Sequence, residues 1–137
     1  MIYALDTNIV SYIIRGEGEA DKRFSQELQA GNSFAIPPMA VYELKRWLMD
    51  NPSKEMRFLA REFDSLYKSV RHKSEMSASA WEEAAKIYIH LKQKGELIED
   101  MHILIASYCL VNDYVLATNN ARHFDRIDGI KYVNWMN

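Results

Sequence analysis

The chain has 137 residues, 48% of them hydrophobic, and a formal net charge of -2. This composition excludes wholesale disorder and a pervasive positive field for coating nucleic acid, and the apolar runs are too short to cross a bilayer. We therefore expect residues 1–137 to form a single domain of a cytoplasmic protein with no membrane partner.

Apolar runs of strand length alternate with longer amphipathic stretches along the whole chain. Gly16, Gly31 and Gly95 suit the ends of helices, and Pro38 suits a first helical turn. In chain order these signals predict a strand at 2–5, helices at 7–15 and 21–30, a strand at 33–36, helices at 37–50 and 54–66, an extended segment at 69–72, helices at 77–94 and 100–111, a strand at 114–117, a helical turn at 121–126 and a strand at 131–133.

Strands that alternate with helices predict an α/β fold, in which helices cover both faces of a parallel sheet. Ligand sites in such folds lie beyond the carboxyl ends of the strands. Two polar clusters, residues 6–8 and 118–120, come directly after predicted strands. We therefore expect a functional site at this edge of the sheet.

Each candidate residue at this edge also has an ordinary explanation. Asp6 ends a buried strand, where a carboxylate needs a compensating cation or a role as a helix cap; Thr7 or Asn8 can also cap the next helix. Glu43 lies within an apolar helix, where a single acidic residue is more often exposed. Asp100 begins a helix and can be its N-cap. Only together do these residues indicate a site.

The order and surroundings of these residues resemble the PIN-domain ribonuclease family, and within it the VapC-like toxins of type II toxin–antitoxin systems. The resemblance covers essentially the full chain, and it implies a PIN-like three-layer α/β/α sandwich around a mainly parallel sheet of four to five strands. The matching segments are 5–11 (LDTNIVS), 41–44 (VYEL), 98–106 (IEDMHILIA), 116–120 (LATNN), Gly95 and the tail at 124–135.

The resemblance implies an endoribonuclease that uses Mg²⁺ or Mn²⁺. Hard divalent cations prefer carboxylate and water oxygens, and they activate water for attack on phosphate. By resemblance Asp6 is a direct metal ligand, and Glu43 is a ligand through water or the base that orients the water. Asn120 extends the catalytic set. The supporting residues are Thr7, Asn8 and Thr118.

The sequence departs from the family pattern at His102. The family usually has an acidic metal ligand four positions before the Ala of its Ile-Ala pair, and here that position is His102. Three readings stay open: His102 binds the metal through a ring nitrogen and favours Mn²⁺ or another transition metal, Asp100 substitutes from the helix start, or the activity is weakened or lost. His123 follows Asn120 by three residues; it either contacts a phosphate near the site or lies at the surface, and we favour the surface position.

The resemblance also implies partners. The substrate is RNA, cleaved in a single-stranded or loop region. A homodimer and a small antitoxin protein are expected, with the antitoxin in an apolar groove. The candidate contacts to RNA phosphates are Lys45, Arg46 and Arg122. The aromatic residues that either fill the core or line the groove are Trp47, Phe58 and Phe63.

Two other functions stay open. A PIN fold without catalysis, kept as a binding module, accounts for His102. A phosphatase-like α/β enzyme with Asp6 as nucleophile is weaker, because such sites want a second acidic residue two positions on and Asn8 stands there. Cys109 is the only cysteine, and its apolar surroundings indicate a small buried hydrophobe rather than a nucleophile.

Overall fold

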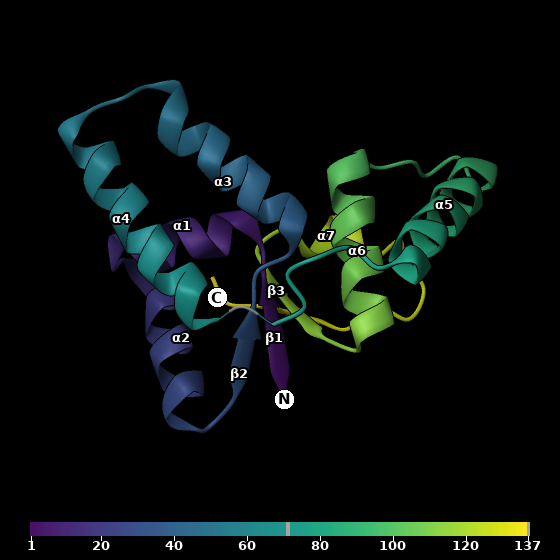
Figure 1. Ribbon diagram of the computed structural model, residues 1–137. Coiled ribbons are helices and arrows are strands. Elements are labelled where there is room, and N and C mark those ends of the chain that lie inside the picture. The colour runs from purple at the N-terminus through teal and green to yellow at the C-terminus, as the bar shows by residue number, and fades with distance from the viewer. Residues whose placement is uncertain (71, 137) are drawn as a thin grey trace.

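The structure, a computed structural model, describes residues 1–70 and 72–136. Strands and helices alternate as the sequence predicts (Figure 1). The strands are β1 (Ile2–Leu5), β2 (Ser33–Ala35), β3 (Val115–Thr118) and β4 (Tyr132–Asn134). The helices are α1 (Thr7–Arg15), α2 (Gly18–Gln29), α3 (Pro38–Asp50), α4 (Lys54–Ser69), α5 (Ala78–Gln93), α6 (Asp100–Asn112) and α7 (Ala121–Phe124).

The strands form one parallel sheet in the order β2-β1-β3-β4. Strand β2 lies on one side of β1, and β3, the next strand along the chain, lies on the other side of β1. The crevice between the carboxyl ends of β1 and β3 is therefore the topological switch point, the usual ligand site of open α/β sheets. Leu5 pairs with Ala117, and the next backbone N–H, that of Asp6, donates to the Ala117 carbonyl at 3.0 Å.

Helices cover both faces of the sheet, which confirms the predicted three-layer α/β/α sandwich. Successive strand residues point to opposite faces, so Tyr3 and Leu5 join one core cluster and Ala4 the other. Helices α1 to α4 cover the first face, while α5 and α6 lie on the opposite side (Figure 1). In the part of the chain that the structure describes, the sheet has four strands.

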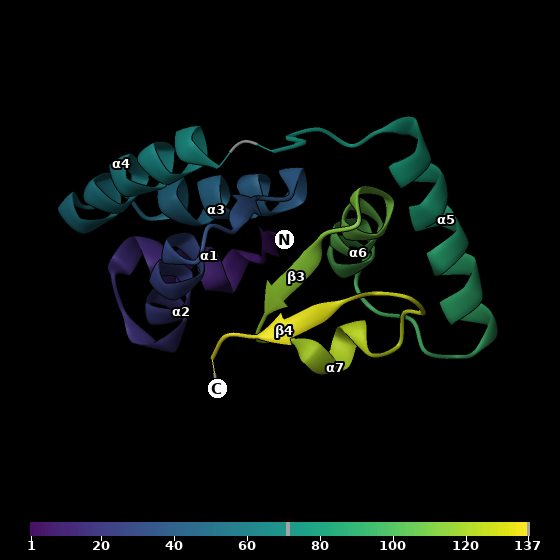
Figure 2. The same cartoon turned by 90° about the horizontal axis from the view of Figure 1, so that it is seen from below.

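Helix α6 is the most deeply buried helix, because α5 packs on its outer side and the sheet on its inner side (Figure 2). Its buried residues therefore surround the helix instead of forming one stripe. Cys109 is fully buried within it, and burial raises the pKa of its thiol. The expectation that Cys109 is a buried hydrophobe is confirmed.

Of the three predicted cap candidates for α1, Asp6 is the N-cap, since its carboxylate accepts a hydrogen bond from the N–H of Thr7. The start of α2 differs from the prediction, because this helix begins at Gly18 rather than Asp21. Its first turn then contains Glu19 and Asp21, whose negative charges are favourable near a helix N-terminus.

The predicted extended segment at 69–72 is wrong in its described part, because α4 continues through Ser69. The reason is the apolar spacing: Leu59 and Phe63 are buried on one face of α4, and Val70, the C-cap residue, is buried too, so the apolar pattern runs past the predicted end. Arg71 lies outside the described residues. Within 1–70 and 72–136, no helix is both long and apolar enough to span a membrane.

Candidate functional site

The carboxylate of Asp6 lies at the switch point between β1 and β3. Asp6 is 4% exposed, its Oδ2 accepts a hydrogen bond from Thr118 Oγ1 at 2.7 Å, and its Oδ1 accepts one from the Thr7 N–H at 2.8 Å. Thr118 is fully buried and accepts in turn from the Asn120 N–H at 2.9 Å. One buried carboxylate therefore joins the ends of two strands.

Glu43 reaches the same place from the second turn of α3. The hydroxyl of Thr7 donates to Glu43 Oε1 at 2.7 Å, while the N–H of the same Thr7 donates to Asp6. Thr7 therefore holds the two carboxylates side by side, although they are far apart in the sequence. Beside them, the side-chain amide of Asn8 donates to Asn119 Oδ1 at 3.4 Å.

The oxygen atoms at this site fit a hard divalent cation. No ion pair joins Asp6 or Glu43 to a Lys, Arg or His in residues 1–70 and 72–136. A buried carboxylate without a cationic partner is costly, and a bound cation removes that cost. The hydroxyl and amide oxygens nearby are also ligands of the kind that Mg²⁺ and Mn²⁺ accept.

The other two predicted metal ligands do not complete a cluster with Asp6 and Glu43. Asp100 is exposed at the first residue of α6. The ring of His102 contacts His123 and Phe124, with ring centroids 4.7 and 5.5 Å away. Among the described residues, no group of three or more His, Cys, Asp or Glu side chains is arranged to hold a metal ion.

His123 is a residue whose place the sequence prediction missed. It is half-buried, and its Nδ1 lies 3.1 Å from Nδ1 of His102, a contact that the sequence did not predict. Burial lowers the pKa of the His123 ring, and the nearby charges of His102, Arg122 and Arg126 lower it further, against an opposing effect of Glu99. The ring is therefore more often neutral near pH 7 than a free histidine.

A cavity of about 470 Å³ opens beside the two carboxylates. Two stacked cation–aromatic pairs lie at it: the Arg15 guanidinium is 5.0 Å from the Trp47 ring centre, and that of Arg46 is 5.1 Å from the ring centre of Tyr42. The cavity thus has acidic groups near the switch point and basic, aromatic groups farther out. It is lined by Thr7, Asn8, Ser11, Tyr12, Arg15, Glu43, Leu44, Arg46, Trp47 and Asn119.

The three predicted phosphate contacts lie in different places. Arg46 lines the cavity, whereas the ammonium of Lys45 lies 5.9 Å from the ring centre of Phe63, and Arg122 is exposed on α7. The structure adds Arg15, which the sequence prediction missed. Arg15 is the last residue of α1, and no pattern in the sequence connects it with α3.

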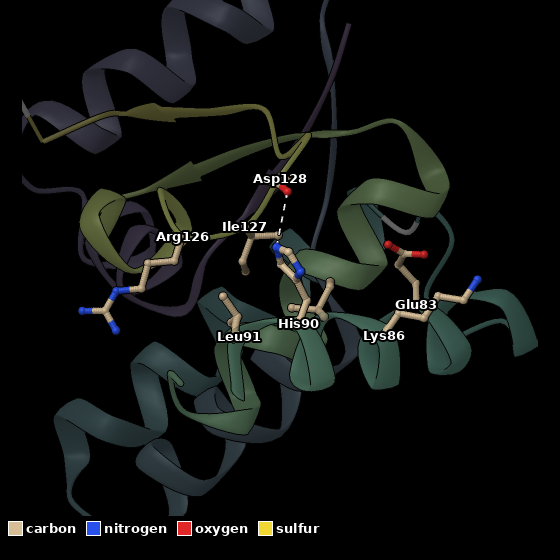
Figure 3. Close-up of a pocket in the computed structure, with 8 residues that line it drawn as sticks. Glu83, Lys86, His90, Leu91, Arg126, Ile127 and Asp128 are labelled. Carbon is tan, nitrogen blue, oxygen red and sulfur yellow. Dashed lines mark ion pairs between the residues drawn. The ribbon is translucent and has the colours of Figure 1, made fainter. Parts of the chain in front are cut away.

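A second cavity, of about 190 Å³, lies between α5 and the segment after α7, and it contains none of the predicted site residues (Figure 3). Among its polar lining residues is His90, whose Nε2 lies 3.5 Å from Asp128 Oδ2. Both side chains are well exposed, so this ion pair is weak. The carboxylates at the strand ends remain the stronger candidate site.

The chain is similar to known proteins over almost its whole length. Residues 3–130 match the PIN domain family. Ribonuclease VapC2 of Rickettsia felis is 30% identical over 135 residues, which are 98% of this chain and 98% of that protein. Ribonuclease VapC1 of Haemophilus influenzae strain R2866 is 24% identical over 98% of both chains.

Solved structures give the same result for the fold. A crystal structure of VapBC2 from Rickettsia felis, bound to a DNA fragment from its promoter, contains a chain with a TM-score of 0.85 and 27% identity, over 98% of this chain and 99% of that one. A chain of VapBC-1 from nontypeable Haemophilus influenzae has a TM-score of 0.83 over all of both chains, and at 23% identity it shows the fold alone.

Proposed function

This chain belongs to the PIN-domain family, and on that ground we propose that it is a VapC-type endoribonuclease, the toxin of a toxin–antitoxin pair, in a single domain that spans residues 1–137. The full-length similarity to a protein named as a ribonuclease supports the activity. It also favours a nuclease over the phosphatase-like alternative with Asp6 as nucleophile.

The observation that carries the proposal is the convergence of Asp6 and Glu43. Thr7 bonds to both carboxylates, and Thr118 holds Asp6 from the neighbouring strand. A buried carboxylate beside a half-buried one is costly unless a positive charge compensates them. Cation binding is the function that best accounts for this cost.

We propose that Asp6 and Glu43 hold one Mg²⁺ or Mn²⁺ ion, with water at the remaining positions. When bound, the ion supplies positive charge to the scissile phosphate and to the attacking water. Glu43 lines the cavity, where it orients that water or accepts its proton. Asp100 and His102, in the first turn of α6, and Asn120, the N-cap of α7, complete the proposed catalytic set. Thr118, Thr7 and Asn8 keep the Asp6 carboxylate in place.

The substrate of the proposed reaction is RNA in a single-stranded or loop region. Single-stranded bases stack on aromatic rings and guanidinium planes, and Trp47 with Arg15 offers both beside the carboxylates. Arg46 is the second basic group at the cavity. Lys45 and Arg122 contribute to the RNA contact from outside the cavity.

The proposed partners are an antitoxin and a second copy of this chain, in the cytoplasm. Relatives with the same fold are described as VapBC assemblies, which supports the antitoxin. Of the three aromatic candidates for its groove, Phe63 is in the core and Trp47 is half-buried, whereas Phe58 is 50% exposed. Phe58 and the 73%-exposed Met49 are therefore two of the exposed apolar side chains that could contact a partner.

A PIN-fold binding module without catalysis is the second candidate. It is favoured by the engagement of His102 with His123, which leaves two carboxylates at the strand ends. The two candidates differ in one outcome: the binding module binds RNA or antitoxin and cleaves nothing with any divalent metal.

The test is RNA cleavage by the purified chain with Mn²⁺ or Mg²⁺, with and without EDTA. We expect cleavage that EDTA stops and that Asp6→Ala removes, while Asp64→Ala on the exposed face of α4 leaves it intact. Cleavage that survives both EDTA and Asp6→Ala contradicts the metal-dependent nuclease. No cleavage with either metal favours the binding module.

A further inference from the structure

Two guanidinium groups, each backed by an aromatic ring, flank Glu43. Arg46 and Trp47 follow Glu43 on α3, about 60° to one side of it and about 40° to the other around the helix axis. Arg46 stacks on Tyr42 and donates to its hydroxyl at 3.4 Å; these two residues are the α3 pair. Arg15, at the end of α1, stacks on Trp47, and these two are the α1–α3 pair.

The two guanidinium groups are available to a ligand in the cavity beside Glu43. Arg15 and Arg46 are both exposed, and both line this cavity. Within residues 1–70 and 72–136, neither forms an ion pair with an Asp or Glu side chain. The ring behind each guanidinium restricts the directions that its plane can take. Two oriented positive groups therefore lie on opposite sides of one carboxylate.

The ligand that fits this arrangement has flat rings joined by a negative charge. Unpaired bases stack on guanidinium planes, and phosphate oxygens accept hydrogen bonds from guanidinium N–H groups. A single nucleotide uses one pair only, whereas two consecutive nucleotides place one base on each side of a shared phosphate. The two arginines also offset the repulsion between the RNA phosphates and the carboxylates of Asp6 and Glu43.

We propose that the α3 pair and the α1–α3 pair are two base-binding sites, which hold consecutive unpaired nucleotides of an RNA strand on either side of Glu43. This inference rests on the proposed function, in which RNA is the substrate. It adds the places of two bases, and it makes Tyr42 the residue that positions Arg46. Stacking accepts every base, so the two sites select unpaired RNA and not a sequence.

The experiment is fluorescence anisotropy of a short labelled oligouridine with the full chain in EDTA, where metal-dependent cleavage does not occur. Arg15→Lys and Arg46→Lys retain the charge but remove the planar group. We expect each to weaken binding by about two- to fivefold while the salt slope stays unchanged. The two losses should multiply in the double variant, to about four- to twenty-fivefold, because the two sites share no side chain.

The role of Tyr42 has its own variants. Tyr42→Ala removes the ring behind Arg46, and we expect it to weaken binding of the oligouridine by about twofold. Tyr42→Phe keeps the ring and should keep the affinity, since the hydroxyl contact at 3.4 Å is long. Tyr88→Ala, at an exposed tyrosine of α5, is the matched control and leaves binding unchanged.

Three results overturn the inference. Lysine variants that bind as tightly as the unmodified chain indicate contacts of charge alone. A loss confined to one arginine leaves only one base-binding site. Absence of oligouridine binding, or equal affinity for double-stranded RNA, removes the proposed ligand. A chain that binds as expected but cleaves RNA with neither Mg²⁺ nor Mn²⁺ contradicts the nuclease alone, and a chain that cleaves RNA without these losses contradicts the two base sites alone.

Discussion

At the β1–β3 junction the polar groups are oxygen atoms held by hydrogen bonds, whereas at the α6–α7 junction they are two nitrogen atoms held by ring packing. Both junctions lie at the carboxyl edge of the sheet. Helix α7 follows the carboxyl end of β3, and the C-terminal end of α6 leads into the amino end of β3, so the first turn of α6 lies toward the carboxyl edge. Asp6 is nearly inaccessible, while His102 and His123 are half-exposed. Neighbouring parts of one fold therefore place oxygen atoms at one junction and ring nitrogens at the other.

The difference follows from how each junction is built. Asp6 has hydrogen bonds to both carboxylate oxygens, from groups on two strand ends. Such a network fixes an acidic group in one position and suits an ion that demands oxygen ligands. The two histidines are on α6 and α7, and the packing of these helices sets the distance between the two rings. The hydrogen bonds at the strand ends do not include them.

The largest expected effect is that of Asp6→Asn, which removes one negative charge while it keeps the shape of the side chain. We expect RNA cleavage to fall by a factor on the order of a hundred or more, as for loss of a group that acts in the chemical step. Asp100→Asn, at the exposed start of α6, is the matched change and lowers the rate by less than about tenfold. Equal losses contradict the assignment of the principal role to the β1–β3 junction.

Thr118→Val tests whether the hydrogen bonds at the strand ends hold the acidic group. The valine has the same shape but leaves Asp6 Oδ2 and the Asn120 N–H without their partner. We expect the free energy of unfolding to fall by about 1.5–3 kcal/mol, measured by chemical denaturation. Ser107→Ala is the control, since its buried hydroxyl bonds only within α6 and its loss costs under about 1 kcal/mol. Similar losses contradict the account.

His102→Asp exchanges a nitrogen ligand for an oxygen ligand at α6. We expect Mn²⁺-dependent cleavage to rise by about tenfold or more. Cleavage rates of the variant and of the unmodified chain at equal Mn²⁺ concentration measure the effect. A variant that gains no activity shows that residue 102 does not contribute to the proposed nuclease site.

The smallest expected effect concerns the outer part of the cavity. Arg15→Ala, in an Asp6→Asn background that prevents cleavage, weakens binding of single-stranded RNA by about two- to fivefold. Fluorescence anisotropy at several salt concentrations should also show the salt slope reduced by about one, as for loss of a phosphate contact. Arg57→Ala on α4 is the control. If both variants bind alike, Arg15 has no part in the RNA contact.

Much of the fold could be predicted from the sequence, because its signals are local. The apolar run before Asp6 and the polar cluster at 118–120 placed two strand ends correctly. The prediction that Asp6 and Glu43 lie at the same edge of the sheet followed from the parallel arrangement of the strands. The end of α4 was predicted too early, because polar residues enter the sequence before Val70, the last buried apolar residue of the pattern.

The missed parts of the site depend on side-chain contacts between distant segments. Thr7 bonds to both carboxylates, but only the packing of α1 against α3 brings its hydroxyl to Glu43. His123 meets His102 because α7 packs on α6, and Arg15 meets Trp47 across two helices. One sequence contains no pattern that encodes such contacts.

The convergence of Asp6 and Glu43 on one ion can be measured in a crystal soaked with Mn²⁺, by anomalous diffraction. The account predicts a peak within about 2.0–2.6 Å of oxygen atoms from both carboxylates. A soaked crystal with an anomalous peak only at His102 and His123, or with none at the β1–β3 junction, contradicts it.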